Sequence, residues 1–391
     1  MQQPPLPLIR PRMPELDSLR GTAVLMVLFF HGFYLSAGAT RFHGPFRLFL
    51  FSTDVGWMGV NLFFVLSGFL ITGILIDSRE RRDYYRKFYS RRALRILPAY
   101  YGILLVILAV SEMKLTARRM SLEFFGLSLI YLANLTPLFG VGMQYAVLWS
   151  LAVEEHFYLI WPAIVRNASG RALRRICGSV IASSIGLRLL YFRQHHDCSA
   201  PYTWLLLDGL AWGALLASWA RGRFSRPSAM LRLALACAGG SLLAVVAFIP
   251  ARITSSGSFA GAVFAQPLIN CFFAGVLALT LVLGTSSYKA IFAPAALKFF
   301  SEISYGLYLV HMLAFDIVDR VLRLWGLQVS WSSGTEALIF ARFIAGASLS
   351  VVLAYLSRWH FEETFLRLKH QHHRQAQPAE MPAALVVRAV P

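Results

Sequence analysis

The sequence is poor in charged residues and in cysteine. Only 14% of its 391 residues are Asp, Glu, Lys or Arg, whereas about 25% is usual in soluble domains. Its four cysteines are scattered, so they indicate neither a disulfide framework nor a metal site. The sequence also lacks a P-loop, a Gly-x-Ser-x-Gly elbow, a His-Glu-x-x-His helix and a Cys-x-x-Cys pair. Soluble hydrolases, nucleotidases and metalloproteases with those motifs therefore have no support.

Long apolar segments take the place of the missing charge. Hydrophobic residues make up 57% of the chain, and runs long enough to cross a bilayer recur along nearly its whole length. The sequence therefore predicts an all-α fold, a polytopic transmembrane helical bundle among membrane lipids. The candidate segments are 17–37, 55–76, 96–111, 122–139, 147–165, 176–192, 202–220, 231–250, 262–284, 299–321 and 336–357.

Acidic residues are the scarcer charge, with 19 Asp and Glu against 37 Lys and Arg, a net charge of +18. The basic excess lies in short loops between apolar segments, above all in residues 77–95. This is the positive-inside pattern of cytoplasmic loops, and it does not indicate nucleic acid. A secondary possibility is that some of these arginines also bind an anionic cytoplasmic ligand.

The same rule sets the topology. Loops 77–95 and 166–175 are both basic, so an even number of crossings must separate them, yet three apolar segments lie between them. The first of the three, 96–111, is short and is followed by more basic residues. We therefore predict about ten crossings plus one re-entrant or partial segment. We expect both termini to be cytoplasmic and the protein to lie in the cell's inner, or cytoplasmic, membrane.

The chain divides into one membrane domain and two short ends. Residues 1–13 form a proline-rich basic lead without the features of a cleavable signal peptide, and residues 14–368 form the membrane domain. Residues 369–391 have the composition of a disordered cytoplasmic tail. Histidines 370, 372 and 373 could bind a metal, but a solvated tail is the favoured interpretation, and we predict no metal site.

The first apolar segment carries the most informative polar pattern. Arg20 and His31 are eleven positions apart, so both fall on one helix face, about 16 Å apart. Asp17 precedes Arg20 by three residues and can orient its guanidinium. Ionisable groups inside a bilayer are costly and usually functional, and an imidazole can take a proton from an alcohol. We predict a functional stripe here; a structural histidine is the alternative.

A second polar stripe lies in segment 147–165. Ser150, Glu154 and Tyr158 are spaced four residues apart and share one helix face. Glu155 is adjacent to Glu154, so we expect only one of these two carboxylates to point into the protein. Either could act as a base or orient a histidine. The alternative is an interhelical hydrogen-bonding cluster without chemistry.

Segment 299–321 carries a third stripe, formed by Ser304, Tyr308 and His311. Asp208 is a further acid within an apolar segment, and Asp54 and Asn61 flank the start of another. Each is a site candidate because polar and ionisable side chains within membrane segments are costly and usually have a function. From these residues alone the protein has a polar chamber and is either an enzyme or a transporter.

Arginines also mark the entrance to segment 96–111. Arg91, Arg92 and Arg95 are spaced so that they can share a helix face and grip phosphates in a bidentate manner. Plain determination of membrane topology explains the same residues equally well.

These stretches resemble the acyltransferase-3 family of integral membrane O-acyltransferases over about residues 13–368. The resemblance covers nearly the whole chain and rests on five motifs in the family's order. They lie at 16–21 with His31, at 59–69, at 88–100, at 149–158 and at 304–311.

The resemblance implies transfer of an acyl group, usually acetyl, from cytoplasmic acyl-CoA to a hydroxyl. The acceptor would be a cell-envelope glycan, a lipid-linked sugar or a secreted glycoside. Acyl-CoA would be a co-substrate, with no bound cofactor, and the oligomeric state is not implied. The family pattern gives His31 and Arg20 the catalytic roles and places Arg92 and Arg95 near the donor and Glu154 near the acceptor.

We group the remaining candidates around those roles. Asp17 joins the catalytic set through Arg20. The acceptor-binding or supporting candidates are Ser150, Tyr158, Asp208, Ser304, Tyr308 and His311. The runner-up function is a transporter or flippase that moves an acyl group or a lipid-linked sugar without chemistry.

Two features depart from the family pattern. The family's Glu-x-Pro-Phe at the end of the last segment reads Glu-Glu-Thr-Phe at residues 362–365, which leaves the end of that helix uncertain. Larger members also carry an esterase-like extracytoplasmic domain, which this sequence does not include. We therefore expect the acceptor to be handled within the membrane domain or with a partner.

Overall fold

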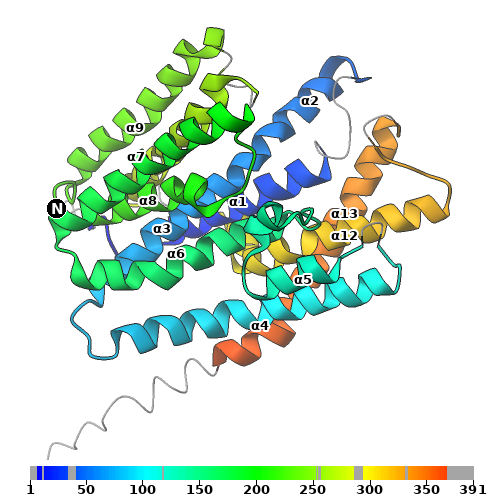
Figure 1. Cartoon of the computed structure of the whole chain (residues 1–391), viewed down its shortest axis with the longest axis horizontal. Helices are drawn as coiled ribbons and strands as arrows, with labels where there is room; N and C mark the ends of the chain where they lie inside the picture. The colour runs from blue at the N-terminus through cyan, green and yellow to red at the C-terminus, as the bar shows by residue number, and fades with distance from the viewer. Residues whose placement is uncertain are drawn as a thin grey trace, which may run out of the picture.

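A bilayer offers no partner for backbone N–H and C=O groups, so a chain this apolar must satisfy them inside helices. The computed structural model is helical accordingly (Figure 1). It describes residues 7–10, 13–33, 41–116, 119–251, 253, 257–285, 294–330 and 333–367. Within those ranges it has no β-strand, only an isolated bridge between Ser330 and Ser333. The predicted all-α class is confirmed.

The helices follow one another with short connections. In chain order they are α1 (Pro14–Gly32), α2 (Gly44–Asp54), α3 (Gly59–Asp77), α4 (Tyr84–Glu112), α5 (Leu122–Leu129), α6 (Val147–Asn167), α7 (Gly170–His195), α8 (Thr203–Ala220), α9 (Pro227–Ala247), α10 (Gln266–Leu283), α11 (Ala295–Glu302), α12 (Ser304–Leu324) and α13 (Glu336–Leu356). Short 3₁₀ turns at Val55–Met58, Ala133–Phe139 and Ile249–Ala251, and π turns at Gly261–Ala265 and Ser357–Glu362, extend or link them.

Six helical stretches in the described ranges are long and apolar enough to cross a membrane. They are Gly44–Asp77, Tyr84–Glu112, Gly170–His195, Pro227–Ala247, Gly261–Leu283 and Glu336–Arg367. The protein is therefore a multi-pass helical bundle, as predicted. The count of about ten crossings and the cytoplasmic termini stay predictions. The tail at 369–391 and most of the lead at 1–13 lie outside the described residues.

The sequence left open which of the three apolar segments between 96 and 165 is partial, and the structure shows where one of them is broken. Residues 96–111 belong to the 29-residue helix α4, so they are not the broken segment. Residues 122–139 are broken instead, since α5 ends at Leu129, Tyr131 has a positive φ of 57°, and a 3₁₀ turn containing Pro137 follows. The loop expected at 77–95 is also shorter. Helix α4 begins at Tyr84, so the basic residues from 84 to 95 are helical. Hydropathy alone placed them in a loop because they are not apolar.

Helix α3 lies at the centre of the bundle and α7 and α9 at its edge. In the apolar stretch of Gly44–Asp77, 67% is buried, against 17% in α7 and in α9. Helices α3 and α8 approach closely at glycines: a Cβ on Gly68 would lie 2.0 Å from the Leu210 carbonyl oxygen, and one on Gly213 2.0 Å from that of Val65. Such small residues let membrane helices pack backbone to backbone.

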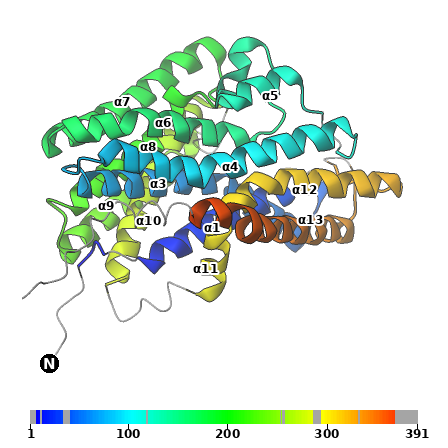
Figure 2. The same ribbon diagram turned by 90° about the horizontal axis from the view of Figure 1, so that it is seen from below.

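The second half of the bundle packs against α1. Figure 2 shows α12 and α13 next to each other, with α12 adjacent to α4 and α1 close to both. The expected segment 299–321 is divided into α11 and α12. At the end of α13, where the family proline is missing, the chain continues through the π turn. Glu362 there is buried and accepts a hydrogen bond from Ser357 at 3.2 Å.

Candidate active site

A cavity of about 300 Å³ is lined by residues of α1, α3, α4, α6 and α12. Helix α3 supplies much of its apolar wall, including Val60, Phe63 and Leu70. The polar lining consists of Arg20, Ser67, Arg92, Arg95, Ser150, Glu154, Glu155, Tyr158, Ser304, Tyr305 and Tyr308. The cavity therefore brings together residues from all three stripes predicted from the sequence.

Three guanidinium groups line this cavity. Arg20 comes from α1, and Arg92 and Arg95 lie three residues apart on α4. The predicted pair with Asp17 is present, with Arg20 Nη1 3.8 Å from Asp17 Oδ1, although Asp17 does not line the cavity. Among the described residues, neither Arg92 nor Arg95 forms an ion pair within 4 Å of a carboxylate. A cavity with three guanidinium groups, two of them without a direct ion pair among the described residues, is suited to phosphate or carboxylate ligands.

Both carboxylates of the α6 stripe line the cavity. The Tyr158 hydroxyl donates to Glu154 Oε2 at 3.1 Å and forms a short hydrogen bond with Ser67. Arg92 lies over the ring of Tyr158, with Cζ 4.3 Å from its centroid. Glu155 also lines the cavity, so the expectation that only one of the two acids would face inward is wrong. Adjacent helix positions differ by about 100°, and the cavity is wide enough to include both.

The side of the cavity formed by α6 and α12 is closed by hydroxyl contacts. Ser150 donates to the Val147 carbonyl at 3.1 Å and is hydrogen-bonded to the Tyr308 hydroxyl. Tyr305 donates to the Ile96 carbonyl at 2.9 Å, which ties α12 to α4. Ser304, the first residue of α12, donates to the backbone carbonyl of Ser301 in α11 at 2.8 Å. Of these groups, the Tyr308 hydroxyl is held by a side chain of a different helix.

His31 does not line this cavity and instead forms a pair with His311. Nδ1 of His31 lies 3.3 Å from Nε2 of His311, and the ring centroids are 4.9 Å apart. The ring of Tyr308 lies 5.8 Å from that of His311. Tyr308 therefore connects the cavity to the histidine pair. The sequence placed His31 and His311 on separate stripes and offered His311 as one of three residues that could hold the acceptor or polarise His31; the structure brings the two rings into contact.

Backbone carbonyls indicate the tautomer of each histidine. Nδ1 of His311 lies 3.1 Å from the Leu307 carbonyl oxygen, so we assign the hydrogen to this nitrogen and the lone pair to Nε2. Nδ1 of His31 lies 3.0 Å from the Val27 carbonyl oxygen as well as near that lone pair, so it carries a hydrogen and donates. The lone pair of His31 is then on Nε2. A ring oriented in this way can accept a proton or attack an electrophile.

The remaining candidates lie elsewhere. Asp208 forms a two-pronged ion pair with Arg188, at 2.7 and 3.1 Å, and accepts from Asn270 at 3.0 Å. Asn270 in turn accepts from Asn61 at 2.7 Å. We call these four residues the closed cluster. They are at most 2% exposed and do not line the cavity. Asp54 lies at the junction of α2 with the following 3₁₀ turn.

Sequence reasoning missed three residues near the site. Ser67 and Tyr305 line the cavity. They lie within the motifs at 59–69 and 304–311, but neither was predicted as a site residue. Arg342 of α13 donates to the Gly32 carbonyl at 2.8 Å, directly after His31, and forms an ion pair with Asp319. Sequence spacing could not indicate the Arg342–Asp319 ion pair, because Asp319 is on α12 and Arg342 is on α13.

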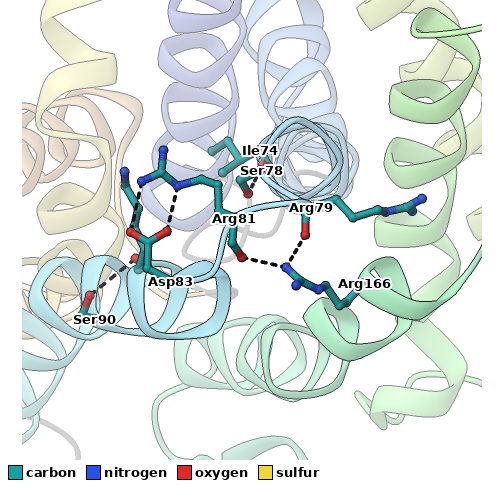
Figure 3. A network of polar contacts seen from close by, with 8 residues as sticks. Ile74, Ser78, Arg79, Arg81, Asp83, Ser90 and Arg166 are labelled. Carbon is teal, nitrogen blue, oxygen red and sulfur yellow. Dashed lines mark hydrogen bonds and ion pairs between the residues drawn. The ribbon is translucent and has the colours of Figure 1, made fainter.

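The loop before α4 is fixed by a separate polar network (Figure 3). Arg166, at the end of α6, donates to the carbonyl oxygens of Arg79 and Arg81, the latter at 2.9 Å. Arg81 in turn forms a two-pronged ion pair with Asp83 at 2.8 and 3.1 Å. Asp83 immediately precedes α4. This network therefore sets where α4 begins, and with it the position of Arg92 and Arg95.

Among the described residues no group of three His, Cys, Asp or Glu side chains could hold a metal ion. Histidines 370, 372 and 373 fall outside the described part of the chain. The donors that line the cavity are guanidinium, carboxyl and hydroxyl groups, which suit an organic anion and an alcohol.

Comparison with known proteins gives consistent results. The chain is 27% identical to the peptidoglycan O-acetyltransferase OatA of Listeria monocytogenes over 345 residues, which cover 81% of this chain and 51% of that protein. It is 31% identical to the putative peptidoglycan O-acetyltransferase YrhL of Bacillus subtilis over 46% of this chain and 28% of that protein. It is 30% identical to the O-acetyltransferase OatA of Staphylococcus aureus over 39% and 24%. The chain thus spans at most about half the length of these relatives.

No solved structure matches the chain. A family model described as an acyltransferase domain matches residues 13–359. The cavity and both histidines lie within that range. Because the match covers most of the 391 residues, this protein belongs to the acyltransferase-3 family of membrane acyltransferases.

Proposed function

We propose that this protein is a membrane-embedded O-acyltransferase. It moves an acyl group, in the simplest case acetyl, from cytoplasmic acyl-CoA to a hydroxyl of a cell-envelope glycan, a lipid-linked sugar or a secreted glycoside. The observation that carries the proposal is the arginine-lined cavity connected through Tyr308 to the paired His31 and His311. The names of the relatives, which specify O-acetyl transfer and in two cases peptidoglycan, support a cell-wall glycan as acceptor.

The arginines supply the donor side. Acyl-CoA carries several phosphate groups at one end and its thioester at the end of a long flexible arm. Arg20, Arg92 and Arg95 offer guanidinium groups for the phosphates, with bidentate geometry available to each. Tyr158 lies beneath Arg92 and orients it. The thioester would then pass Ser150 and Tyr308 toward the histidine pair.

His31 supplies the proton transfer. Its Nε2 lone pair takes the proton from the acceptor hydroxyl, whose oxygen attacks the thioester carbonyl carbon. The C–S bond breaks, and the departing thiolate takes the proton from the imidazolium. In the alternative route, the same lone pair attacks the carbonyl carbon first, the C–S bond breaks and CoA leaves as its thiolate. The acceptor hydroxyl then attacks the acyl group, the N–acyl bond breaks to restore the Nε2 lone pair, and the hydroxyl proton goes to the thiolate. In both routes His311 holds the Nδ1 hydrogen of His31 and so keeps the reactive lone pair on Nε2.

Orientation in the membrane follows from the same proposal. The loop that holds Arg79 and Arg81, the start of α7 and the end of α8 lie at one end of the bundle, where Asp77 pairs with Arg221. This end is the most basic, so we assign it to the cytoplasm of the cell membrane. The arginines of the cavity then face the compartment that contains acyl-CoA.

The test is acyl transfer by the purified full chain in detergent. With radiolabelled acetyl-CoA and envelope glycan fragments, the wild-type protein should add label to the glycan, and mass spectrometry should show one added acetyl group. Substitution His31→Ala should lower this rate by at least about 100-fold, the usual scale for loss of an acid–base group. The exposed His360 provides a matched control, since His360→Ala should retain the wild-type rate.

Two outcomes would contradict the proposal. A His31→Ala protein that transfers acetyl at the wild-type rate would remove this residue from the chemistry. A wild-type protein that neither hydrolyses acyl-CoA nor labels any glycan, yet moves lipid-linked sugars across vesicles, would identify a transporter instead.

A further inference from the structure

A second cleft lies at the basic end of the bundle, separate from the catalytic cavity. It has a volume of about 410 Å³ and runs between the first turns of α7 and the last turns of α8. Its walls are Arg171, Arg174, Arg175, Gly178, Leu215 and Trp219. None of these residues lines the first cavity. The α6 end, where Arg166 meets the loop of Figure 3, lies directly before it in the chain.

The charge of this cleft is one-sided. Three of its six walls are guanidinium groups, and no carboxylate lines it. In the described part of the chain none of the three forms an ion pair, and the Arg174 Nη1 atom is 3.5 Å from Ser218 Oγ, a weak contact. The neighbouring Arg221, by contrast, forms a two-pronged pair with Asp77. The cleft therefore has the donors for an oxyanion and no internal anion that uses them.

The position of the cleft at the edge of the bundle indicates which class of anion could bind there. Only 17% of the apolar stretch of α7 is buried, and Leu187 and Leu190 of this helix are exposed, so its outer face meets lipid chains. Trp219 is half-buried at the same end, as is typical of aromatic side chains at the level of lipid headgroups. A basic pocket between helices at the cytoplasmic surface is a common site for acidic lipid headgroups.

We propose that this cleft binds the phosphate headgroup of an anionic phospholipid from the cytoplasmic leaflet. The guanidinium groups hold the phosphate oxygens, Trp219 and Leu215 cover the glycerol region, and the acyl chains lie along the outer face of α7. Topology alone requires positive charge near the membrane but not a cleft with an aromatic and an apolar wall. The proposal is independent of acyl transfer, because the cleft and the catalytic cavity share no residue.

The experiment measures thermal unfolding of the purified full chain in a neutral detergent while short-chain lipids are added. Dihexanoylphosphatidylglycerol should raise the midpoint temperature at concentrations at least about tenfold lower than dihexanoylphosphatidylcholine. The triple variant Arg171→Gln, Arg174→Gln, Arg175→Gln should lose this preference. The double variant Arg171→Gln, Arg175→Gln, which changes only exposed side chains, should weaken it and guards against a folding defect.

A matched control removes the same charge outside the cleft. Arg223, Arg226 and Arg232 are exposed residues that follow α8 or lie in the first turns of α9, and their replacement by Gln should leave the preference for phosphatidylglycerol unchanged. Equal responses of wild type and triple variant would overturn the proposal. So would protection by inorganic phosphate, or by adenosine 3′,5′-bisphosphate, at concentrations as low as those of the lipid, because the site would then serve a soluble phosphate.

Discussion

The arginine-lined cavity and the closed cluster both place charged side chains inside the apolar bundle. In the closed cluster, α3, α7, α8 and α10 contribute Asn61, Arg188, Asp208 and Asn270, one each. One cation meets one anion through two hydrogen bonds, and the two amides use the remaining acceptors. All four side chains are essentially sealed from solvent. Nothing in the cluster is available to a ligand.

The cavity has the opposite balance. It contains three guanidinium groups and two carboxylates, and its cations lie half-exposed or exposed toward the open space. Tyr158, Ser67, Ser150 and Tyr308 form hydrogen bonds around the cavity wall, whereas the side chains of Arg92 and Arg95 line the cavity without a hydrogen bond to any of the described residues. Polar groups inside a membrane bundle therefore fall into two kinds. Those whose donors and acceptors are matched hold helices together, and those left unmatched around an open space are candidates for ligand binding.

The largest expected effect is a loss of stability when the closed cluster is broken. Substitution Asp208→Leu removes the only carboxylate of the closed cluster and leaves the Arg188 guanidinium buried and unpaired. We expect it to lower the free energy of unfolding by about 3–5 kcal/mol. The double variant Asp208→Leu, Arg188→Met should recover most of this loss, because no buried charge remains. Thermal unfolding in detergent measures both, and a single variant as stable as wild type would assign the cluster no structural role.

The cavity arginines should show the reverse pattern. Replacing Arg92 or Arg95 by Gln removes a cation that forms no ion pair within 4 Å among the described residues, so the free energy of unfolding should change by less than about 1 kcal/mol. Each substitution should raise the KM for acyl-CoA by about 10- to 100-fold, the scale of a charge-assisted hydrogen bond of about 1.5–3 kcal/mol. Steady-state kinetics with varied acyl-CoA measures this. An unchanged KM with a strongly lowered stability would place these arginines with the closed cluster.

Tyr308 combines features of both kinds of polar group, because it lines the cavity and is also hydrogen-bonded to Ser150 of another helix. Tyr308→Phe removes that bond, while Ser150 keeps its acceptor on Val147. We expect a loss of about 0.5–1.5 kcal/mol in stability and a fall in kcat of about 2- to 10-fold, with the KM for acyl-CoA unchanged. A raised KM instead would show that this hydroxyl binds the donor.

The sequence predicted much of this site because helical spacing is local. Arg20 with Asp17, the α6 stripe and the gathering of Arg92 and Arg95 all followed from positions three or four residues apart. It could not separate Asp208 from Glu154, since both are acids within apolar segments and their partners come from other helices. The His31–His311 contact joins residues 280 positions apart. The break after Leu129 and the early start of α4 depend on a positive φ at Tyr131 and on a polar but helical stretch, which hydrophobic patterns do not report.

The smallest expected effect comes from the solvated ion pair between Arg81 and Asp83 in the loop of Figure 3. It serves as an exposed reference for the buried Arg188–Asp208 pair. The Arg81 guanidinium, through its hydrogen bonds with Asp83, lowers the pKa of Asp83 below its ordinary value. A lowered pKa in the folded state means that the pair stabilises the fold above the ordinary pKa of an aspartate, near 4, and that this contribution is lost as the pH falls through the lowered value. Asp83→Asn should therefore lower the unfolding temperature slightly at pH 7, and this difference should shrink as the pH falls below about 4, whereas Asp208→Leu should remain destabilised wherever the protein is folded. Thermal scans of both variants across this range measure the difference. If Asp83→Asn cost as much as Asp208→Leu at pH 7, burial would not be what distinguishes a structural charge pair from a solvated one in this bundle.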